Sequence, residues 1–255
     1  MELFDTHCHL NHIDFDSDRE EARQRAREAG VTRLLCIGFD LASSRSAIQL
    51  SIWEEMRAAI GIHPESAEEW SLEAAATFRQ LYDTGKAAAY GEIGLDFHWD
   101  SVPRARQSEV FREQIAFAST LSPTLPLIIH TRDALAETLA ILEASETKAP
   151  IVMHCFTGDV QEAAACLNAG CYLGIGGVAT FKKSEDVRAA IAYAPLERLL
   201  LETDCPYLAP QYKRGRRNEP SYLPAIAEIV ATAKGLTVQE IAEMTTETAR
   251  RIFGF

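Results

Sequence analysis

Short apolar runs alternate with longer amphipathic stretches along the whole chain. Runs rich in Val, Ile and Leu predict eight strands, at 2–7, 33–38, 57–62, 87–92, 125–130, 150–154, 171–176 and 198–203. Each run is followed by a segment in which apolar residues recur at helical spacing. This alternation is typical of βα units that build a parallel sheet.

Turn and capping residues fall at the predicted boundaries. Gly30, Gly85 and Gly170 each lie between a helical stretch and a strand, where a left-handed residue commonly ends a helix. Other polar residues precede helical stretches and suit the N-cap position, three of them with Glu three residues later. These predicted N-caps are Ser17, Asp133, Asp159, Ser184 and Thr237.

The size and composition of the chain suit one domain. It has 255 residues, of which 47% are hydrophobic and 24% charged, and no Pro, Gly or Ser linker divides it. Eight βα units in this length predict a single TIM (β/α)8 barrel over residues 1–255. The active site of such a barrel lies at the C-terminal ends of its strands.

Charge and cysteine content limit the possible environments and partners. No run approaches the roughly 20 apolar residues of a membrane span, so we expect a soluble, cytoplasmic protein with no membrane contact. The net charge of −12 disfavours broad non-specific binding of nucleic acid. The six cysteines lack Cys-x-x-Cys spacing and predict buried apolar residues without disulfides. We expect a monomer by default.

Six potential metal ligands stand at the ends of predicted strands. His7 and His9 are two residues apart on the first strand, so their side chains share one face and can hold one cation. Any one of the six is more often a hydrogen-bonded polar residue than a ligand, but together they predict a metal centre. The set is His7, His9, Glu92, His130, His154 and Asp204.

The mixture of imidazole and carboxylate donors favours Zn²⁺ or Mn²⁺, and Mg²⁺ fits if water completes the coordination shell. One cation rarely takes six protein ligands of this kind, whereas two cations bridged by Glu92 do so easily. Two such cations about 4 Å apart activate a shared water and stabilise both the attacking and the leaving oxygen of a phosphoryl transfer. We therefore predict a hydrolase.

Several residues could contact a phosphate at the same rim. His63 follows the third strand, with a structural role as its alternative, and Arg132 follows His130, with a salt bridge as its alternative. After the eighth strand, a basic stretch includes Arg214, Arg216 and Arg217. Arginine suits bidentate phosphate binding, although such a run can also be a solvated loop.

At these residues the chain resembles the TatD family of metal-dependent deoxyribonucleases. The similar motifs run from residues 4–10 to residues 249–254, and the most diagnostic lie at 91–96, 129–134, 154–158, 200–210 and 214–220. The resemblance implies a TIM barrel with two divalent cations, usually Mg²⁺, that removes nucleotides from the 3′ end of DNA. We therefore expect single-stranded DNA ends as the substrate.

The resemblance also implies roles for individual residues. His7, His9, Glu92 and Asp204 would hold one metal, and Glu92, His130 and His154 the other. Asp204 would orient or deprotonate the attacking water, while His63 and the arginine loop would engage phosphate. Two positions depart from the family pattern: Glu65, where a second His is common, and Thr248, where Asn is usual.

Two alternatives remain open at this point. The same ligands could serve a carbonyl hydrolase that cleaves an ester or amide, such as an aminoacyl ester on RNA, because fold does not fix function. A non-enzymatic binding protein is disfavoured, since every expected ligand position is occupied.

Overall fold

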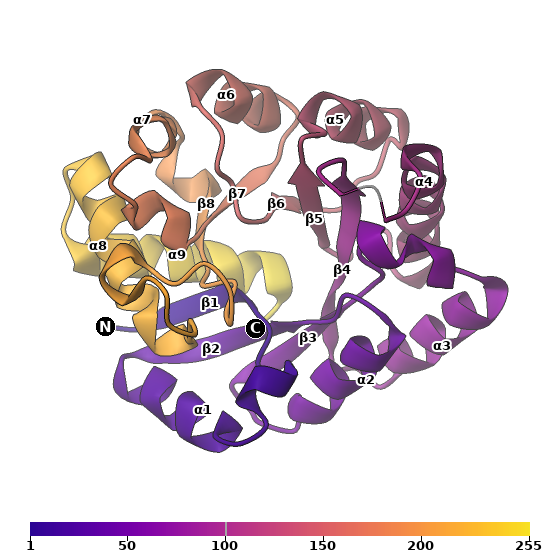
Figure 1. Cartoon of the computed structure of the whole chain (residues 1–255), viewed down its shortest axis with the longest axis horizontal. Coiled ribbons are helices and arrows are strands. Elements are labelled where there is room, and N and C mark those ends of the chain that lie inside the picture. Colours follow the sequence, from indigo (N-terminus) through magenta and orange to yellow (C-terminus); the bar gives the residue numbers. More distant parts are fainter. Residues whose placement is uncertain (100) are drawn as a thin grey trace. The chain divides into compact units, whose positions relative to one another are not determined.

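The computed structural model describes residues 1–99 and 101–255. The chain forms two compact units: Met1–Cys36 with Cys155–Phe255, and Ile37–His154. The first unit is therefore built from both ends of the chain, and the second is one continuous segment. The eight strands are ordered β1 to β8, as they occur in the chain, which is the order of a (β/α)8 barrel (Figure 1).

The first unit contains the first two and last two strands. Its elements are β1 (Leu3–Cys8), α1 (Arg19–Glu28), β2 (Val31–Ile37), α6 (Val160–Asn168), β7 (Tyr172–Ile175), α7 (Glu185–Tyr193), β8 (Leu199–Leu201), α8 (Leu223–Lys234) and α9 (Val238–Phe253). Its short 3₁₀ helices are η1 (Ile13–Phe15), η3 (Gly177–Thr180), η4 (Leu196–Arg198), η5 (Gln211–Lys213) and η6 (Pro220–Tyr222).

The second unit contains the four middle strands. Its elements are α2 (Leu41–Leu50), β3 (Met56–Ile60), η2 (Pro64–Glu69), α3 (Leu72–Asp83), β4 (Ala87–Asp96), α4 (Arg104–Leu121), β5 (Leu127–Arg132), α5 (Leu135–Ala144) and β6 (Ile151–Met153). Here β3 pairs with β4, β4 with β5, and β5 with β6, all in parallel.

All eight predicted strands are confirmed, and two of them have informative boundaries. Strand β4 continues to Asp96, so Glu92 lies inside the strand and not at its end. Strand β5 begins at Leu127, two residues later than predicted. The preceding Pro126 has no N–H to donate, but its carbonyl oxygen accepts a 2.7 Å hydrogen bond from the Tyr90 N–H.

The predicted helix caps are only partly correct. Asp159 and Thr237 form capping boxes with Glu three residues later, and Gly30, Gly85 and Gly170 have positive φ angles. Ser184 is the N-cap residue of α7, although its side chain forms no capping hydrogen bond with the helix.

Ser17 and Asp133 were wrong as N-caps. Helix α1 is preceded by Asp18, and α5 is preceded by Ala134. Asp18 does not cap α1, because its carboxylate accepts hydrogen bonds from Arg25 and Arg217. The Asp133 carboxylate instead lies 3.1 Å from His98 Nδ1.

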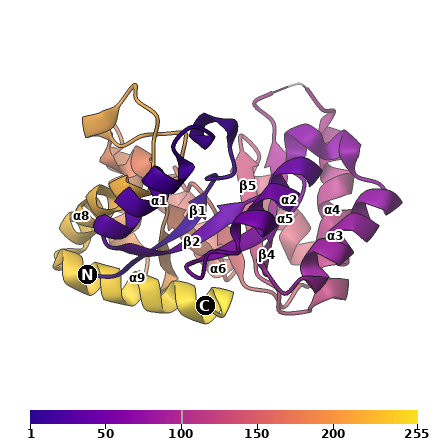
Figure 2. The same cartoon turned by 90° about the horizontal axis from the view of Figure 1, so that it is seen from below.

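Helix α9 closes one end of the first unit by packing against β1 (Figure 2). Its buried side chains include Ile241, Thr245, Ala249 and Ile252, which follow one another at helical spacing. Thr246 Oγ1 donates a 3.2 Å hydrogen bond to the carbonyl oxygen of Glu2, just before β1. The helix therefore covers the N-terminal end of the strand and leaves its C-terminal end for other groups.

Among the described residues, no helix combines the length and apolar character that crossing a bilayer requires.

Candidate metal centres

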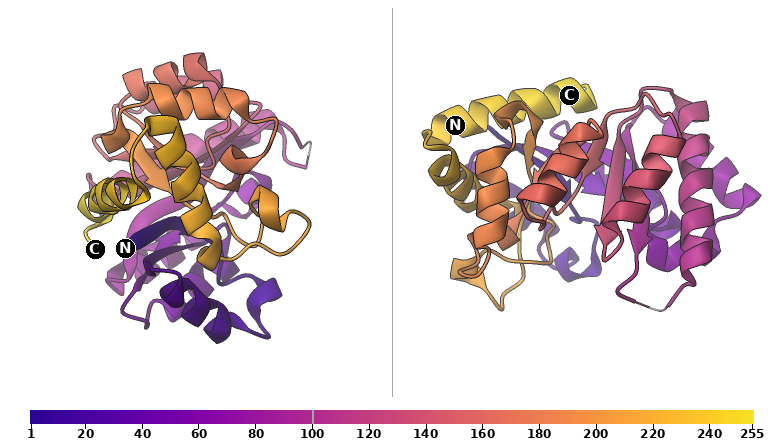
Figure 3. Two further views of the ribbon diagram at one scale, coloured as in Figure 1. Left: turned by 90° about the vertical axis from the view of Figure 1, so that its left-hand side faces the viewer. Right: turned by 90° about the horizontal axis from the view of Figure 1, so that it is seen from above.

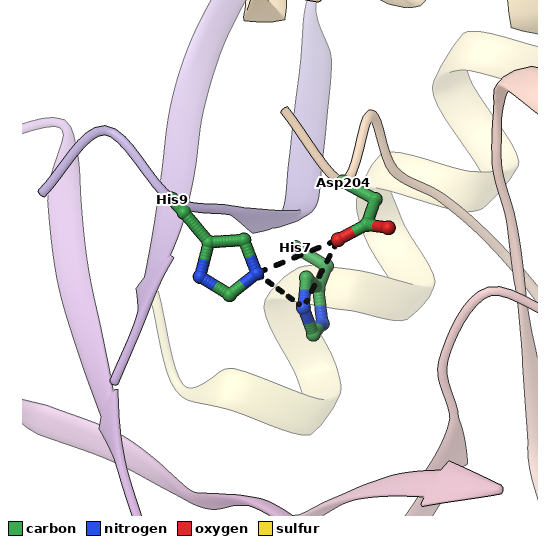
Figure 4. Close-up of side chains that lie close together, drawn as sticks. All are labelled: His7, His9 and Asp204. Carbon is green, nitrogen blue, oxygen red and sulfur yellow. Dashed lines mark hydrogen bonds and ion pairs between the residues drawn. The ribbon is translucent and has the colours of Figure 1, made fainter. Parts of the chain in front are cut away.

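The first unit brings His7, His9 and Asp204 together at the C-terminal ends of β1 and β8 (Figure 4). The two imidazole Nε2 atoms lie 3.3 Å apart. Asp204 Oδ1 is 3.7 Å from His7 Nε2 and 3.4 Å from His9 Nε2. The His7 side chain is fully buried, whereas 11% of the Asp204 side chain is exposed, so Asp204 is the most exposed member of the cluster.

Hydrogen bonds from the backbone fix the position of this cluster. Asp204 N–H donates to the His7 carbonyl oxygen at 2.9 Å, and His9 N–H donates to the Cys205 carbonyl oxygen at 2.8 Å. Asp204 itself has a φ angle of +57°, an uncommon conformation for a residue with a side chain. Such strained residues concentrate at functional sites, where surrounding contacts hold them in place.

Beneath the cluster, Asp5 links β1 to the segment after β8. Its carboxylate accepts hydrogen bonds from Thr203 Oγ1 at 2.6 Å and from Thr203 N–H at 2.9 Å. It also accepts a 3.3 Å hydrogen bond from His7 N–H. Burial raises the pKa of Asp5 to about 7, although the hydrogen bonds from Thr203 and His7 oppose this shift.

The second unit also gathers imidazoles and carboxylates. His130 Nδ1 lies 2.9 Å from Glu92 Oε1 and 3.1 Å from His154 Nε2. His154 Nε2 is 2.8 Å from the same Glu92 oxygen. Three of the predicted ligands therefore converge on one point in this unit.

A fourth residue of this group, Asp96, was missed as a site residue. It is buried, and its Oδ2 lies 3.0 Å from His130 Nε2. The strand register pairs His130 with Gly94, the residue midway between Glu92 and Asp96 on β4. The even spacing of 92, 94 and 96 places both carboxylates on one strand face, and this pattern could have identified Asp96 from the sequence.

Gly94 allows this close pairing of β4 and β5. Its φ angle is +142°, and a Cβ atom at this position would collide with the carbonyl oxygen of His130. Glycine is therefore required where the two strands that carry the candidate ligands approach each other.

The two ends of the His130 ring have different neighbours. Burial alone would lower the pKa of His130, but hydrogen bonds to Asp96 and Glu92 outweigh it and raise the pKa. Burial alone would raise the pKa of Asp96, but the hydrogen bond with His130, the charge of that ring and the hydrogen bond from the His98 N–H together outweigh burial and lower the pKa. An ionised Asp96 only accepts hydrogen bonds, so it favours a proton on Nε2 and leaves the Nδ1 lone pair facing Glu92 and His154.

His63 lies beside this group. Its Nε2 atom is 3.6 Å from Glu92 Oε1, and its ring centroid is 4.3 Å from that of His130. His63 Nδ1 accepts a 3.2 Å hydrogen bond from the Glu65 N–H. Burial, together with the neighbouring His130, lowers the pKa of His63 to about 3, so the ring is neutral at pH 7.

Both groups fit divalent cations. In the first unit, two imidazole nitrogens and a carboxylate oxygen lie within 4.8 Å of one another, and His63, Glu92 and His130 do so in the second unit. Neutral imidazole and carboxylate are common ligands of Zn²⁺ and Mn²⁺. In each unit the donor atoms face one another, which is the arrangement that a shared cation stabilises.

The whole chain matches known proteins. The model of a family described as TatD-related DNase covers residues 4–254. The chain is 43% identical to an uncharacterized metal-dependent hydrolase, YabD, of Bacillus subtilis, over 98% of each chain. It is also 39% identical to a protein of Pantoea ananatis named 3′-5′ ssDNA/RNA exonuclease TatD, over 99% of each chain. The chain belongs to the TatD family.

A solved structure supports the same assignment. The TatD homologue YjjV of Escherichia coli has a TM-score of 0.93 with this chain, at 28% identity, over 99% of this chain and 98% of the other. The predicted TIM-barrel fold is confirmed. This TatD-family protein is a metal-dependent hydrolase, as the sequence predicted.

The basic residues of this TatD-family chain differ in their surroundings. Arg214 and Arg216 are exposed, and the Arg214 guanidinium carbon lies 4.7 Å from the centroid of the Phe181 ring. Arg217 instead donates two hydrogen bonds to the Asp18 carboxylate, at 2.6 and 2.7 Å. Arg217 therefore already has an anionic partner within the chain.

Arg132 extends from the exposed end of β5, two residues beyond His130. Its guanidinium carbon lies 5.5 Å from the centroid of the Trp99 ring, and half of Trp99 is exposed.

The two positions that depart from the family pattern differ in their exposure to solvent. Glu65 is exposed beside His63, and Thr248 is buried in α9.

The six cysteines of the TatD-family chain are all free thiols. Cys8, Cys36 and Cys205 are fully buried, and burial raises the pKa of Cys36 to about 12. A thiol with so high a pKa is a poor nucleophile at pH 7. These residues therefore serve as small apolar side chains behind the candidate ligands.

Proposed function

We propose that this protein is a 3′–5′ exonuclease that hydrolyses phosphodiester bonds at the ends of single-stranded DNA. The observation that carries the proposal is that Asp204 and the exposed Arg214 and Arg216 belong to one segment after β8. A candidate metal ligand and two phosphate-binding cations thus follow the same strand. The relative named 3′-5′ ssDNA/RNA exonuclease TatD supports the same substrate class.

The proposed ligands follow the two groups. His7, His9 and Asp204 hold one cation, and Glu92, His130 and His154 hold another, with Mg²⁺ as the metal expected for activity. Asp96 accepts the Nε2 proton of His130 and orients its ring, as carboxylates commonly do for metal-binding imidazoles. That Glu92 also serves the first cation stays a prediction from the family resemblance.

Bound divalent cations would lower the pKa of a coordinated water and neutralise charge on the phosphoryl oxygens. Within the chain, Asp204 is the group best suited to orient the attacking water and accept its proton, because it is a carboxylate and its side chain is the most exposed of the first group. Neutral His63 donates a hydrogen bond from Nε2 to a substrate oxygen. Arg214 and Arg216 bind the phosphates of the strand, and Arg132 offers a further cation.

The first experiment measures nucleotide release from a 3′-labelled single-stranded DNA in Mg²⁺, Mn²⁺ or Zn²⁺. Glu92→Ala serves as the control for contaminating nuclease, because it removes the carboxylate that faces both His130 and His154. Release by the wild type that disappears in Glu92→Ala is the expected result. Activity at full rate in this variant would overturn the ligand assignment.

A parallel assay on an aminoacyl ester tests the carbonyl-hydrolase alternative. Hydrolysis confined to the ester, with no nucleotide release in any metal, would replace the nuclease proposal. The sequence further predicts a monomeric, cytoplasmic enzyme, and both points stay predictions.

A further inference from the structure

Two loops of the first unit form a basic surface beyond the candidate ligands. One loop is residues 180–183, which begins at the last residue of η3, and the other is residues 211–216, which includes η5. Gln211 N–H donates a 2.8 Å hydrogen bond to Thr180 Oγ1, and Lys182 N–H donates a 3.4 Å hydrogen bond to Gln211 Oε1. The surface, here called the paired-loop surface, has the cations Lys182, Lys183, Lys213, Arg214 and Arg216.

Aromatic rings accompany these cations. The Arg214 guanidinium lies over Phe181, and Lys213 Nζ is 5.6 Å from the Tyr212 ring centroid and 5.3 Å from that of Tyr222. Tyr212 is 61% exposed. Exposed aromatic faces next to cations are the combination that binds single-stranded nucleic acid, since bases stack on the rings and phosphates contact the cations.

The paired-loop surface is preorganised. Arg188 of α7 donates from Nη1 to the carbonyl oxygens of Ala179 and Phe181, at 3.0 and 2.7 Å. Its Nη2 donates to the carbonyl oxygen of Lys182 at 3.3 Å. These bonds hold the backbone beneath the cations in place. Binding a ligand therefore costs less conformational entropy, because the loop is already ordered.

The paired-loop surface lies at the same end of the first unit as the Asp204 segment. Both loops follow strands β7 and β8, and the loop after β8 projects at the end of the unit away from α9 (Figure 3). Gly177 allows close approach here, because a Cβ atom at this position would collide with the carbonyl oxygen of Leu208. The backbone after Asp204 therefore packs directly on η3.

The acidic residues nearest in the chain are Glu185 and Asp186, in the first turn of α7, where carboxylates favour the helix dipole. On the other side of the basic stretch, Asp18 and Glu219 are paired with Arg25 and Arg217. The remaining cations thus give a local positive region on a chain with a net charge of −12.

We infer that the paired-loop surface binds single-stranded DNA upstream of its 3′ end, through phosphate contacts to Lys182 and Lys183 and base stacking on Phe181 and Tyr212. This inference rests on the proposed nuclease function for its substrate class. It assigns a role to residues 181–183 and Tyr212, which lie outside the ligand groups. It also predicts that long strands bind more tightly than short ones.

Binding is measured by fluorescence anisotropy in Mg²⁺, with a labelled 12-nucleotide oligothymidylate whose last three 3′ linkages are phosphorothioates. Compared with wild type, Lys182→Ala/Lys183→Ala should bind about tenfold more weakly. The slope of log affinity against log salt should fall by about 1.4, since each phosphate contact on a single strand contributes about 0.7. Arg45→Ala/Lys148→Ala removes two other exposed cations and is the charge-matched control, with affinity expected within about twofold of wild type.

A second variant tests base stacking. Phe181→Ala should weaken binding of the 12-mer several-fold. Binding of an abasic 12-mer should be unchanged, because this probe has phosphates but no bases. Equal loss with both probes would overturn the stacking role. A 3-nucleotide probe should bind wild type and Lys182→Ala/Lys183→Ala equally.

Hydrolysis of bis(p-nitrophenyl) phosphate in Mn²⁺ separates this inference from the proposed function. The small diester does not span the paired-loop surface, so wild type and Lys182→Ala/Lys183→Ala should turn it over equally. If wild type degrades DNA but the double variant keeps wild-type affinity and salt slope, the inference fails and the nuclease proposal stands. If wild type cleaves neither DNA nor the diester, the nuclease proposal fails. The inference is then judged only by the affinity and the salt slope of Lys182→Ala/Lys183→Ala relative to wild type.

Discussion

His130 Nε2 lies 3.0 Å from Asp96 Oδ2, on the side of the ring away from Glu92. The imidazole is therefore held between two carboxylates of the same strand. One of them faces the proposed cation with His154, and the other fixes the ring and its proton. The first of four predictions tests this arrangement, and the other three test metal binding and two charged pairs or residues of the first unit.

Asp96→Asn should weaken metal binding in the second unit by about 10- to 100-fold, because the neutral amide oxygen accepts a weaker hydrogen bond from His130 Nε2 than a carboxylate does. Titration calorimetry with Mn²⁺ measures the affinity. Asp133→Asn, which changes an exposed carboxylate beside His98, is the matched control and should bind like wild type. An Asp96→Asn affinity equal to that of wild type would show that Asp96 does not orient the ligand.

Chelation should destabilise the protein as well as inactivate it. A cation present at 100 times its Kd stabilises the folded state by about 2.7 kcal/mol, which for a chain of this size raises the melting temperature by roughly 5–10 °C. Calorimetric melting with EDTA and with added Mg²⁺, Mn²⁺ or Zn²⁺ measures the shift. His7→Ala/His9→Ala should lose part of it, and a melting temperature insensitive to every metal would count against both sites.

Removing the Asp18 carboxylate should lower stability at neutral pH more than in acid. Hydrogen bonds from Arg217 and then Arg25 hold the pKa of Asp18 well below its usual value, despite an opposing effect of burial. The ionised form therefore stabilises the fold above about pH 4, and this contribution disappears as the pH falls further.

Urea denaturation of wild type and Asp18→Asn should differ by about 1–2 kcal/mol at pH 7, after allowance for solvent screening. The difference should shrink toward pH 3. Asp83→Asn, at an exposed carboxylate, should match wild type throughout. A difference that is independent of pH would point to packing and not to charge.

Arg216 and Arg217 should behave differently, although they are adjacent. Arg216→Ala removes an exposed cation, so it should weaken DNA binding and lower the slope of log affinity against log salt by about 0.7. The free energy of unfolding should change by less than about 0.5 kcal/mol. Arg217→Ala removes the partner of a part-buried carboxylate and should cost roughly 1–3 kcal/mol of stability. The reverse pattern would return Arg217 to the phosphate-binding group.

Local patterns in the sequence were enough to predict the alternating elements and most of the side chains that the two candidate groups bring together. His7 and His9 were recognisable because alternation on a strand gives them a common face. No local pattern indicates that Asp133 lies beside His98, because a side chain that suits an N-cap can take a tertiary partner instead. The ion pair of Arg217 with Asp18 could not be predicted either, because the two residues are about 200 positions apart and only the fold brings them together.

The discontinuous first unit has a consequence for biosynthesis. His7 and His9 leave the ribosome early, but the carboxylate that completes their group is residue 204, and Thr203, which anchors Asp5, comes just before it. At about 5–20 residues per second, the two histidines wait roughly 10–40 s for these partners. The continuous segment Ile37–His154 is complete about 50 residues earlier, roughly 3–10 s before residue 204. The candidate ligands of the middle segment are therefore synthesised together, whereas the first group is completed only in the last quarter of the chain.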